Sequence, residues 1–320
     1  MKTLGRLLLL VVIAGLVFGG LFYERPLWVL QQGTHLSLFL HRVQSNYVMM
    51  PEGRVHYYEA ESRVPGGGIP LVLVHGLADR DESWAPMLER LKRSGFHVYA
   101  PDLLGYGRSP KPADSDYSIS TQEQFVADFI QAIGLQKPNV GGWSMGGWIV
   151  LKLALDHPDM VDRVVIYDSA GIHQQVEGGA NIFHPTNGPA LQHLADLLEP
   201  HAKPMPAFVM KDALRTLGEG QWVVDKSMAS MEGGNDLLDT RLGGLTEPLL
   251  IVWGSDDQLL PLTIGQQLHG MVPRSEMDIL AGCGHLAPKT CPDRAAAVTV
   301  DFLMENPAPS GGTYTLSQSR

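Results

Sequence analysis

The sequence predicts an α/β protein with a mostly parallel central sheet flanked by helices. Beyond residue 46, short apolar runs alternate with helical segments, which is typical of strands joined by helical crossovers. Several of the apolar runs end in glycine, aspartate or histidine, as in IPLVLVHG, PNVGGWS and SEMDILAGCGH. Because the carboxyl ends of parallel strands carry the binding loops, we expect the functional residues to lie there.

The expected strands can be placed in order along the chain. NYVMM and RVHYYEA flank the turn residues PEG and predict an opening hairpin. Buried strands are then expected in IPLVLVHG, HVYAPDLLG, PNVGGWS, RVVIYDSAG, PLLIVWG and SEMDILAGCGH. Helices are expected between them, including residues 121–134, where Thr121 and Gln124 are predicted to form a capping box. A last helix is expected to begin at Pro292.

One stretch interrupts this alternation. Residues 172–245 contain no segment that predicts a strand, whereas NGPALQHLADLLEP and PAFVMKDALRTLG look helical. We therefore expect a helical cap inserted after the sixth strand, with residues 46–171 and 246–306 forming the α/β core. Residues 307–320 are rich in proline, glycine and serine and are expected to form a flexible tail.

The N-terminal segment, residues 1–45, is expected to be a membrane anchor and its juxtamembrane continuation. Lys2 and Arg6 precede an uncharged apolar run of seventeen residues from Leu7 to Tyr23. Such a helix would be roughly 25 Å long, slightly short of a bilayer core, so interfacial aromatic residues would have to complete the span. The basic residues favour a single pass with the catalytic domain on the extracytoplasmic side. The alternative is a cleaved signal peptide, which would give a secreted or periplasmic protein.

Composition excludes some partners and sites. The chain has 320 residues and a formal net charge of −10, with no basic stripe, so nucleic acid is not an expected partner. Cys283 and Cys291 are the only cysteines, too few for a disulfide scaffold and wrongly spaced for structural zinc. Two free thiols are the favoured expectation, and a disulfide between them is the alternative outside the cytosol. No metal site is expected.

The stretch GGWSMGG, residues 141–147, supplies the candidate nucleophile. Ser144 stands in the pattern G-x-S-x-G between an expected strand and an expected helix. Glycines two residues away on each side permit a turn so tight that the serine hydroxyl is raised above the sheet edge. The hydroxyl then lies at the mouth of a helix, whose free N–H groups favour a developing negative charge.

A serine hydroxyl needs a base within hydrogen-bond reach and a third group to orient that base. His285 is the candidate base, because it follows the last expected strand of the core. Asp256 and Asp257 follow the preceding strand and are the candidate acids. Asp168, after an earlier strand, is the fallback, and Asp102 is expected to tie loops together.

The motifs together resemble the serine-hydrolase branch of the α/β-hydrolase fold. LVLVHGLADRDESW, PDLLGYGRS, GGWSMGG, DSAG, WGSDDQLLP and GCGH occur in the family's order over residues 70–305, most like the membrane-anchored monoacylglycerol-lipase-like and bacterial lipase/esterase group. The resemblance implies that the acid is Asp257, four residues after Trp253. It also implies an oxyanion hole formed by the backbone N–H groups of Leu77 and Met145, and no metal or organic cofactor. His75 would brace a loop.

The resemblance implies a carboxylic ester hydrolase. An apolar cap together with a membrane anchor favours a small lipophilic ester as substrate, such as a monoacylglycerol or a short-to-medium acyl ester. Trp143, where several relatives carry a smaller or polar residue, is a candidate for the pocket wall, together with Phe208 and Met210 of the cap. Apolar cap residues could line an acyl-chain pocket or pack the cap onto the core. They are Leu191, Leu194, Leu197, Met205, Phe208, Met210, Trp222, Met228 and Met231.

Two alternative functions stay open. The first is hydrolysis of a carbon–carbon bond in a ring-fission diketone acid, which would need a cationic pocket, with Arg80 and Arg241 as candidates. The second is a non-catalytic binding protein on the same fold. The presence of a serine, a histidine and an aspartate in the right order argues against it.

Overall fold

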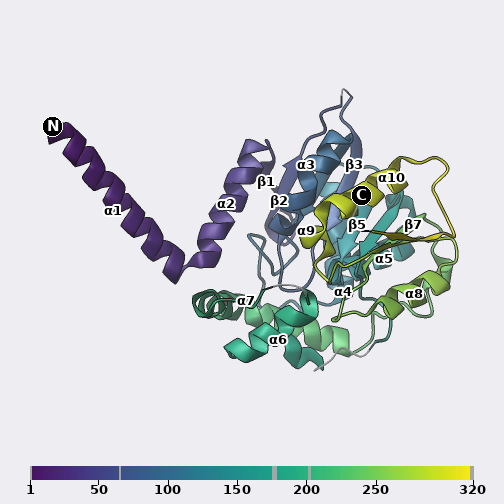
Figure 1. The fold of residues 1–320 in the computed structure, drawn as a ribbon. Coiled ribbons are helices and arrows are strands. Elements are labelled where there is room, and N and C mark those ends of the chain that lie inside the picture. Colours follow the sequence, from purple (N-terminus) through teal and green to yellow (C-terminus); the bar gives the residue numbers. More distant parts are fainter. Residues whose placement is uncertain (1, 65, 175–178, 201–202, 318–320) are drawn as a thin grey trace.

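The computed structural model describes residues 2–64, 66–174, 179–200 and 203–317. Within them the strands form one sheet in the order β1-β2-β4-β3-β5-β6-β7-β8-β9. Every pairing from β4 to β9 is parallel, and only β1 and β2 run antiparallel to their neighbours. The predicted mostly parallel sheet with flanking helices is therefore confirmed (Figure 1).

Strands β1 to β8 lie in the segments that the sequence predicted. The opening hairpin comprises β1 and β2, and β5, β6 and β7 are buried along their whole length, as the centre of a parallel sheet requires. The bounds are Gln44–Met50 (β1), Gly53–Ala60 (β2), Ile69–Val74 (β3), Phe96–Pro101 (β4), Asn139–Trp143 (β5), Val164–Tyr167 (β6), Leu249–Gly254 (β7) and Glu276–Leu280 (β8).

Helices cover both faces of the sheet. One apolar cluster joins the sheet to α4, α5 and α8, and a second joins the opposite face to α3 and α10. The bounds are Ala85–Arg93 (α3), Ile119–Ala132 (α4), Met145–Asp156 (α5), Leu262–Met271 (α8), Ala287–Thr290 (α9) and Pro292–Met304 (α10), with short 3-10 helices at Asp81–Trp84, Pro158–Met160, Gly179–Phe183 and Leu242–Gly244.

The expected ends of two helices can be compared with the structure. Helix α10 begins at Pro292, as predicted. The capping box predicted for Thr121 and Gln124 is wrong, because the N-cap of α4 is Ser118. Its side chain accepts a hydrogen bond from the backbone N–H of Thr121. The helix therefore starts one turn earlier than the sequence pattern suggested.

A helical cap follows β6, the sixth strand, as expected. It contains α6 (Gly188–Leu198) and α7 (Ala207–Glu232), which lie together below the sheet in Figure 1. Several hydrogen bonds tie the cap to the core, including those of Tyr106 and His285. The hydroxyls of Tyr106 and Ser227 are 2.9 Å apart, and the backbone N–H of His285 donates to the carbonyl of Leu198 at 2.8 Å. The second bond connects the end of α6 to the loop after β8.

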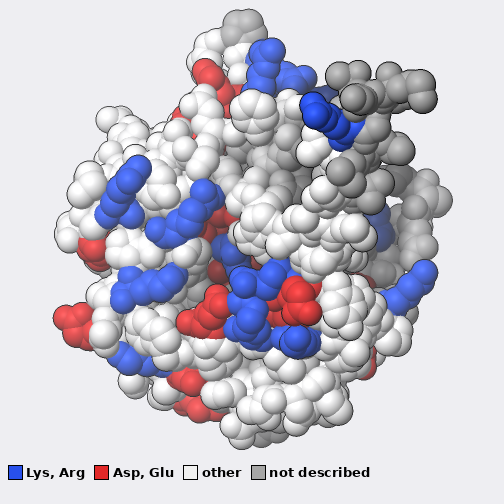
Figure 2. Space-filling model, turned by 90° about the vertical axis from the view of Figure 1, so that its left-hand side faces the viewer, with Lys and Arg blue, Asp and Glu red and all other residues white. Residues whose placement is uncertain are grey.

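The N-terminal segment forms two helices, α1 (Lys2–Glu24) and α2 (Pro26–Leu40), and α1 extends away from the sheet (Figure 1). Their junction packs against α7. The rings of Phe22 and Tyr23 lie 5.9 and 5.4 Å from the ring of Phe208. The buried carboxylate of Asp212 accepts the N–H of Leu27 at 3.0 Å. Basic and acidic side chains lie beside one another on the face that carries these helices (Figure 2).

The predicted membrane-spanning anchor is not supported. Among the described residues, none of the helices combines the length and the apolar character needed to cross a bilayer. The apolar run predicted to span is seventeen residues long, and such a helix covers roughly 25 Å of a hydrocarbon core that is about 30 Å thick. Large apolar side chains on α1 and α2 are exposed, namely Leu10, Val11, Leu16, Val17, Phe18, Leu30, Leu36, Phe39 and Leu40.

The flexible tail predicted for residues 307–320 is wrong in its central part. Residues Thr313–Leu316 form β9, which pairs in parallel with β8. Without β9, strand β8 would leave a row of backbone groups unpaired at the edge of the sheet. Residues Thr313–Leu316 alternate polar and larger side chains, as in a strand. This pattern is short, and the surrounding proline, glycine and serine favoured a loop.

The favoured expectation for the cysteines is also wrong. Cys283 and Cys291 form a disulfide, with their Cα atoms 6.3 Å apart. Cys283 follows β8 and Cys291 precedes α10, so the bond closes the loop that carries His285. Cys283 is fully buried within one apolar cluster. The disulfide therefore holds this loop against the core.

We predict that the disulfide contributes measurably to stability. Closing a loop with a sequence separation of 8 should stabilise the fold by about 2.5 kcal/mol. Urea denaturation of the wild type with and without reductant should show this difference. The double variant Cys283→Ser, Cys291→Ser is the control and should not respond to reductant. An unchanged free energy of unfolding in the reduced wild type would contradict the prediction.

Candidate active site

Ser144 occupies a strained turn between β5 and α5. Its backbone has φ 56° and ψ −117°, a conformation that residues with side chains rarely adopt. The neighbouring backbone segments approach so closely that side chains would collide. A Cβ on Gly142 would lie 2.1 Å from the carbonyl oxygen of Gly146, and a Cβ on Gly146 would lie 2.2 Å from that of Val74. The glycines therefore make this turn possible, and the turn places Ser144 at the N-terminus of α5.

His285 and Asp257 are joined by a buried hydrogen bond. The Nδ1 atom of His285 lies 2.8 Å from Oδ2 of Asp257. The other carboxylate oxygen accepts the backbone N–H groups of Leu259 at 2.9 Å and Leu260 at 2.8 Å. An ionised carboxylate can only accept, so Nδ1 carries the proton and Nε2 is left with its lone pair. This is the protonation state that a general base requires.

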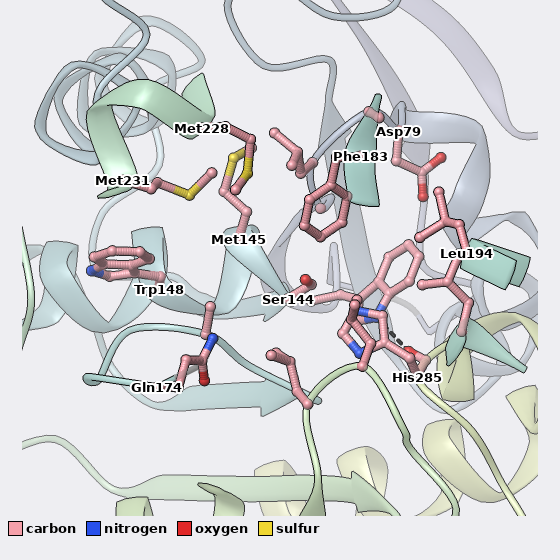
Figure 3. A pocket seen from close by; sticks show the side chains of 18 of the residues that line it. Asp79, Ser144, Met145, Trp148, Gln174, Phe183, Leu194, Met228, Met231 and His285 are labelled. Atoms are coloured by element: carbon pink, nitrogen blue, oxygen red, sulfur yellow. Dashed lines mark hydrogen bonds between the residues drawn. The ribbon is translucent and has the colours of Figure 1, made fainter. Parts of the chain in front are cut away.

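Ser144 and His285 line the same cavity, which has a volume of about 780 Å³. Both side chains reach into it in Figure 3. None of the hydrogen bonds within the described residues joins the Ser144 hydroxyl to the imidazole. Such bonds often tighten only when substrate is bound. The structure thus brings together the three residues that the sequence singled out, with the Asp257–His285 contact formed.

The two expected oxyanion donors border the same cavity. Met145 is the first residue of α5, so its N–H has no acceptor within the helix. Leu77 follows Gly76, where a Cβ would lie 3.3 Å from the Cβ of Ser144. The loop before Leu77 therefore runs directly against the serine turn. Leu77 and Met145 thus both border the cavity that Ser144 lines, as an oxyanion hole formed by their N–H groups would require.

His75 braces this loop, as expected. Its Nε2 accepts the N–H of Leu103 at 3.0 Å, and its Nδ1 lies 2.8 Å from the carbonyl oxygen of Gly76. The Nε2 contact requires a lone pair, so Nδ1 is the donor to Gly76. Burial lowers the pKa of His75, which keeps the imidazole neutral.

The other candidate acids have different partners. Asp256 is half-buried, and its carboxylate accepts the hydroxyl of Ser255. Asp168 is buried and accepts the N–H of Gly254 at 2.7 Å. Burial raises the pKa of Asp168 well above its ordinary value, and the nearby Asp257 carboxylate adds to the shift. The structure therefore favours Asp257 over both as the partner of His285.

Asp102 ties loops together, as expected, and belongs to a buried cluster with His56 and Asp81. Its oxygens accept the backbone N–H groups of Asp81 at 3.0 Å and Arg108 at 2.8 Å. Burial alone would raise the pKa of Asp102, but the hydrogen bond with His56 and its other partners lower it to about 2. His56 Nδ1 is 2.6 Å from Asp81, and Nε2 is 2.8 Å from the hydroxyl of Ser45. Both imidazole nitrogens are thus engaged in bracing the core.

The cavity is lined mostly by apolar residues from the core and the cap. Trp143 lines it, as predicted. Phe208 and Met210 are not among the described lining residues, which contradicts the prediction that they bind substrate. Phe208 faces α1 instead, and Met210 lies near Gly188. Of the other cap candidates, Leu191, Leu194, Met205, Met228 and Met231 line the cavity, whereas Leu197 and Trp222 are not among the described lining residues.

The cationic residues proposed for a substrate carboxylate are placed elsewhere. Arg80 is not among the described residues that line the cavity, and Arg241 pairs with Asp156. Lys289 is the single lysine or arginine of the described lining, and it pairs with Asp79 at 2.9 Å. Sequence reasoning missed both Asp79 and Lys289. Asp79 lies two residues after Leu77, and Lys289 lies four residues after His285. This closeness in sequence to candidate site residues could have identified them.

Comparisons with known proteins agree with this architecture. The family model of the alpha/beta hydrolase fold matches residues 69–196. A 2-hydroxymuconate semialdehyde hydrolase of Pseudomonas sp. is 28% identical over 257 residues, covering 75% of this chain and 88% of that protein. The crystal structure of a membrane phospholipase A, a bacterial virulence factor, is 26% identical with a TM-score of 0.78. This match covers 95% of this chain and 98% of that chain.

A putative lipase from Acinetobacter baumannii has a TM-score of 0.75 at 20% identity, covering 86% of this chain and 95% of that one. At this identity the likeness concerns the fold alone. Together with the sheet order and the serine turn, these matches show that the chain has the α/β-hydrolase fold.

We predict that Asp257→Asn reduces kcat by about 10⁴, because an amide leaves the imidazole in the wrong tautomer. Asp256→Asn, one residue away, is the matched control and should retain most of the turnover. Steady-state hydrolysis of a p-nitrophenyl ester measures both. A larger loss in the Asp256 variant would transfer the acid role to that residue.

We also predict a pH-dependent stability difference for Asp168→Asn. The folded wild type holds a proton at Asp168, so this group stabilises the fold below its unfolded pKa of about 3.9 and loses that contribution as pH rises. The neutral amide does not titrate. Urea denaturation should show the variant gaining stability relative to wild type as pH rises above about 4, until the Asp168 carboxyl of the folded wild type has ionised. Asp159→Asn, at an exposed position, is the control, and a pH-independent difference would refute the assignment.

Proposed function

We propose that this α/β-hydrolase-fold protein is a serine hydrolase that cleaves carboxylic esters of lipophilic acids, such as monoacylglycerols. The observation that carries the proposal is that His285, hydrogen-bonded to Asp257, borders the same apolar cavity as Ser144. In this proposal Ser144 is the nucleophile, His285 the general base and Asp257 the group that orients the imidazole.

The proposed mechanism has two acyl-transfer steps. The Ser144 hydroxyl attacks the ester carbonyl while Nε2 of His285 takes its proton. The N–H groups of Leu77 and Met145 stabilise the oxyanion, each contributing about 3 kcal/mol in the transition state. The alcohol then leaves with the proton from His285. Water, activated by the same imidazole, attacks the acyl-enzyme and releases the acid. No cofactor takes part in these steps.

The lipophilic acyl group is inferred from the lining of the cavity. Leucine, methionine, phenylalanine and tryptophan side chains surround Ser144, and Met145, Met228 and Met231 lie on one side of it (Figure 3). Methionine side chains adapt to chains of different shape. Such a lining stabilises an alkyl chain by burying its apolar surface. The phospholipase A and lipase among the structural relatives also act, by their names, on lipids.

Hydrolysis of a carbon–carbon bond is the second candidate. It is favoured by the 2-hydroxymuconate semialdehyde hydrolase that matches this chain at 28% identity. A substrate acid of that type would need an unpaired cation in the cavity. In the described lining, Lys289 is the one basic side chain besides histidine, and Asp79 already neutralises it. We therefore place ester hydrolysis first. A non-catalytic binding role would leave the strained turn at Ser144 without a purpose.

We further propose that the protein works at a membrane surface on the extracytoplasmic side, with the N-terminal helices in contact with lipid. The exposed apolar side chains of α1 and α2 support this location. The match to a membrane phospholipase A covers 95% of this chain, so it includes this region in part or whole. The disulfide between Cys283 and Cys291 is typical of an oxidising compartment. A secreted or periplasmic form after signal cleavage is the alternative.

The proposal predicts that the full-length protein hydrolyses p-nitrophenyl esters and reacts with a fluorophosphonate probe. Ser144→Ala should remove probe labelling and lower kcat by a factor of about 10⁶. Retention of both activities in this variant would defeat the assignment. A ring-fission diketone acid should be assayed beside the esters. If it were the better substrate by kcat/KM, carbon–carbon bond hydrolysis would replace ester hydrolysis.

A further inference from the structure

An ion pair that the proposed mechanism does not use lies in the wall of the cavity. Nζ of Lys289 is 2.9 Å from Oδ2 of Asp79, and both residues border the cavity. The ammonium also lies 4.9 Å from the ring centre of Trp143, the residue before Ser144. Ser83 donates its hydroxyl to the other oxygen of Asp79. In a cavity lined otherwise mostly by apolar groups, these charges form a polar subsite.

The ion pair lies on the His285 side of the serine. The indole N–H of Trp143 donates to the carbonyl of His285 at 2.8 Å, so the ring beneath Lys289 also contacts the proposed base. The Trp143 and His285 rings are 5.8 Å apart. In Figure 3, Asp79 and His285 lie to one side of Ser144, whereas Met228 and Met231 lie to the other.

This placement indicates which end of the cavity would hold the alcohol of an ester and which end would hold its acyl chain. The leaving alcohol must receive its proton from His285, so the alcohol lies on the imidazole side of Ser144. The acyl chain then extends toward the methionines. The ion pair is consequently at the alcohol end of the cavity, and the apolar lining is at the acyl end.

The pair can bind hydroxyl groups without attracting an anion. Burial raises the pKa of Asp79, but Lys289 and its other neighbours outweigh this and lower it, so the pair stays ionised. Oδ2 of Asp79 is shielded from solvent and faces the ammonium at 2.9 Å, whereas the side chain of Lys289 is 33% exposed. An ammonium has three N–H groups, so those not directed at Asp79 can donate to the oxygen of a substrate hydroxyl. The carboxylate would repel a phosphate or carboxylate placed beside it.

We propose that Asp79 and Lys289 bind the free hydroxyl groups of the ester's alcohol, and that the substrate is the ester of a polyol such as glycerol. Lys289 donates hydrogen bonds to the hydroxyl oxygens, and Asp79 holds the ammonium in place and neutralises its charge. This specificity rests on the proposed ester hydrolysis, whose chemistry it extends to the alcohol half of the substrate.

The test compares esters that share one acyl chain. Glycerol monooctanoate, ethyl octanoate and octanoyl glycerophosphate are hydrolysed by the full-length wild type and by Asp79→Asn and Lys289→Gln. The measured quantity is the ratio of kcat/KM for the glycerol ester to that for the ethyl ester. We expect a wild-type preference for the glycerol ester and a roughly tenfold fall of the ratio in each variant, equivalent to about 1.4 kcal/mol.

Lys152→Gln is the matched control, because Lys152 pairs with Asp156 at 2.7 Å and neither residue is among the described cavity lining. It should leave the ratio at the wild-type value. Thermal melting checks that each variant folds. A folded variant remains informative even when its turnover is low, because the ratio compares two substrates of the same variant.

Each other outcome has a defined meaning. If wild type cleaves ethyl octanoate and the ratio is the same in all variants, the pair is not a hydroxyl subsite, while ester hydrolysis stands. If wild type cleaves none of the three esters, the proposed function itself fails. If the glycerophosphate ester is preferred and Lys289→Gln abolishes that preference, the pair binds anions and the polyol assignment is overturned.

Discussion

The close approach of β5, α5 and the loop after β3 is the constraint on which the rest of the site depends. Glycine at 142 and 146 lets backbone pass within van der Waals distance of backbone, and Ser144 is held at φ 56° between them. A conformation of this kind costs of order 1–3 kcal/mol and persists because the surrounding sheet and helix are buried and well packed. The same approach places Leu77 and Met145 on the cavity that Ser144 lines. The proposed nucleophile and the proposed oxyanion donors would thus depend on a single steric arrangement.

The base reaches this turn through the parallel topology. Strands β5, β7 and β8 all end at the same edge of the sheet, so the loops carrying Ser144, Asp257 and His285 converge although the residues are far apart in sequence. Asp257 and the nearby Asp168 have different partners. Two backbone N–H groups and His285 satisfy the oxygens of Asp257, whereas Asp168 has a raised pKa because of burial and the charge of Asp257. Of these two adjacent buried carboxylates, Asp257 is the one that faces the imidazole.

The parts that sequence reasoning predicted are those set by local pattern and by chain order. Buried parallel strands read as apolar runs, and the serine turn has a glycine requirement that only one stretch of the chain meets. Properties that depend on partners distant in sequence were not predictable in this way. Phe208 is apolar and lies in the cap, but its ring packs on Phe22 and Tyr23 of α1. Strand β9 exists because β8 offers it an edge. Whether Cys283 reaches Cys291 depends on how α10 packs, which spacing alone does not fix.

The end of α6 in the cap is bonded to the loop that carries His285, and this contact limits how substrate can reach Ser144. His285 is held by Asp257 through its side chain, by Leu198 of α6 through its N–H, and by the disulfide that closes its loop. Gly284 lies so close to α6 that a Cβ there would be 2.6 Å from the carbonyl of Leu198. A cap that swung away as a rigid lid would have to break the contact with Leu198 and release the loop carrying the base. A path for substrate that leaves His285 in place must therefore keep the end of α6 on the His285 loop.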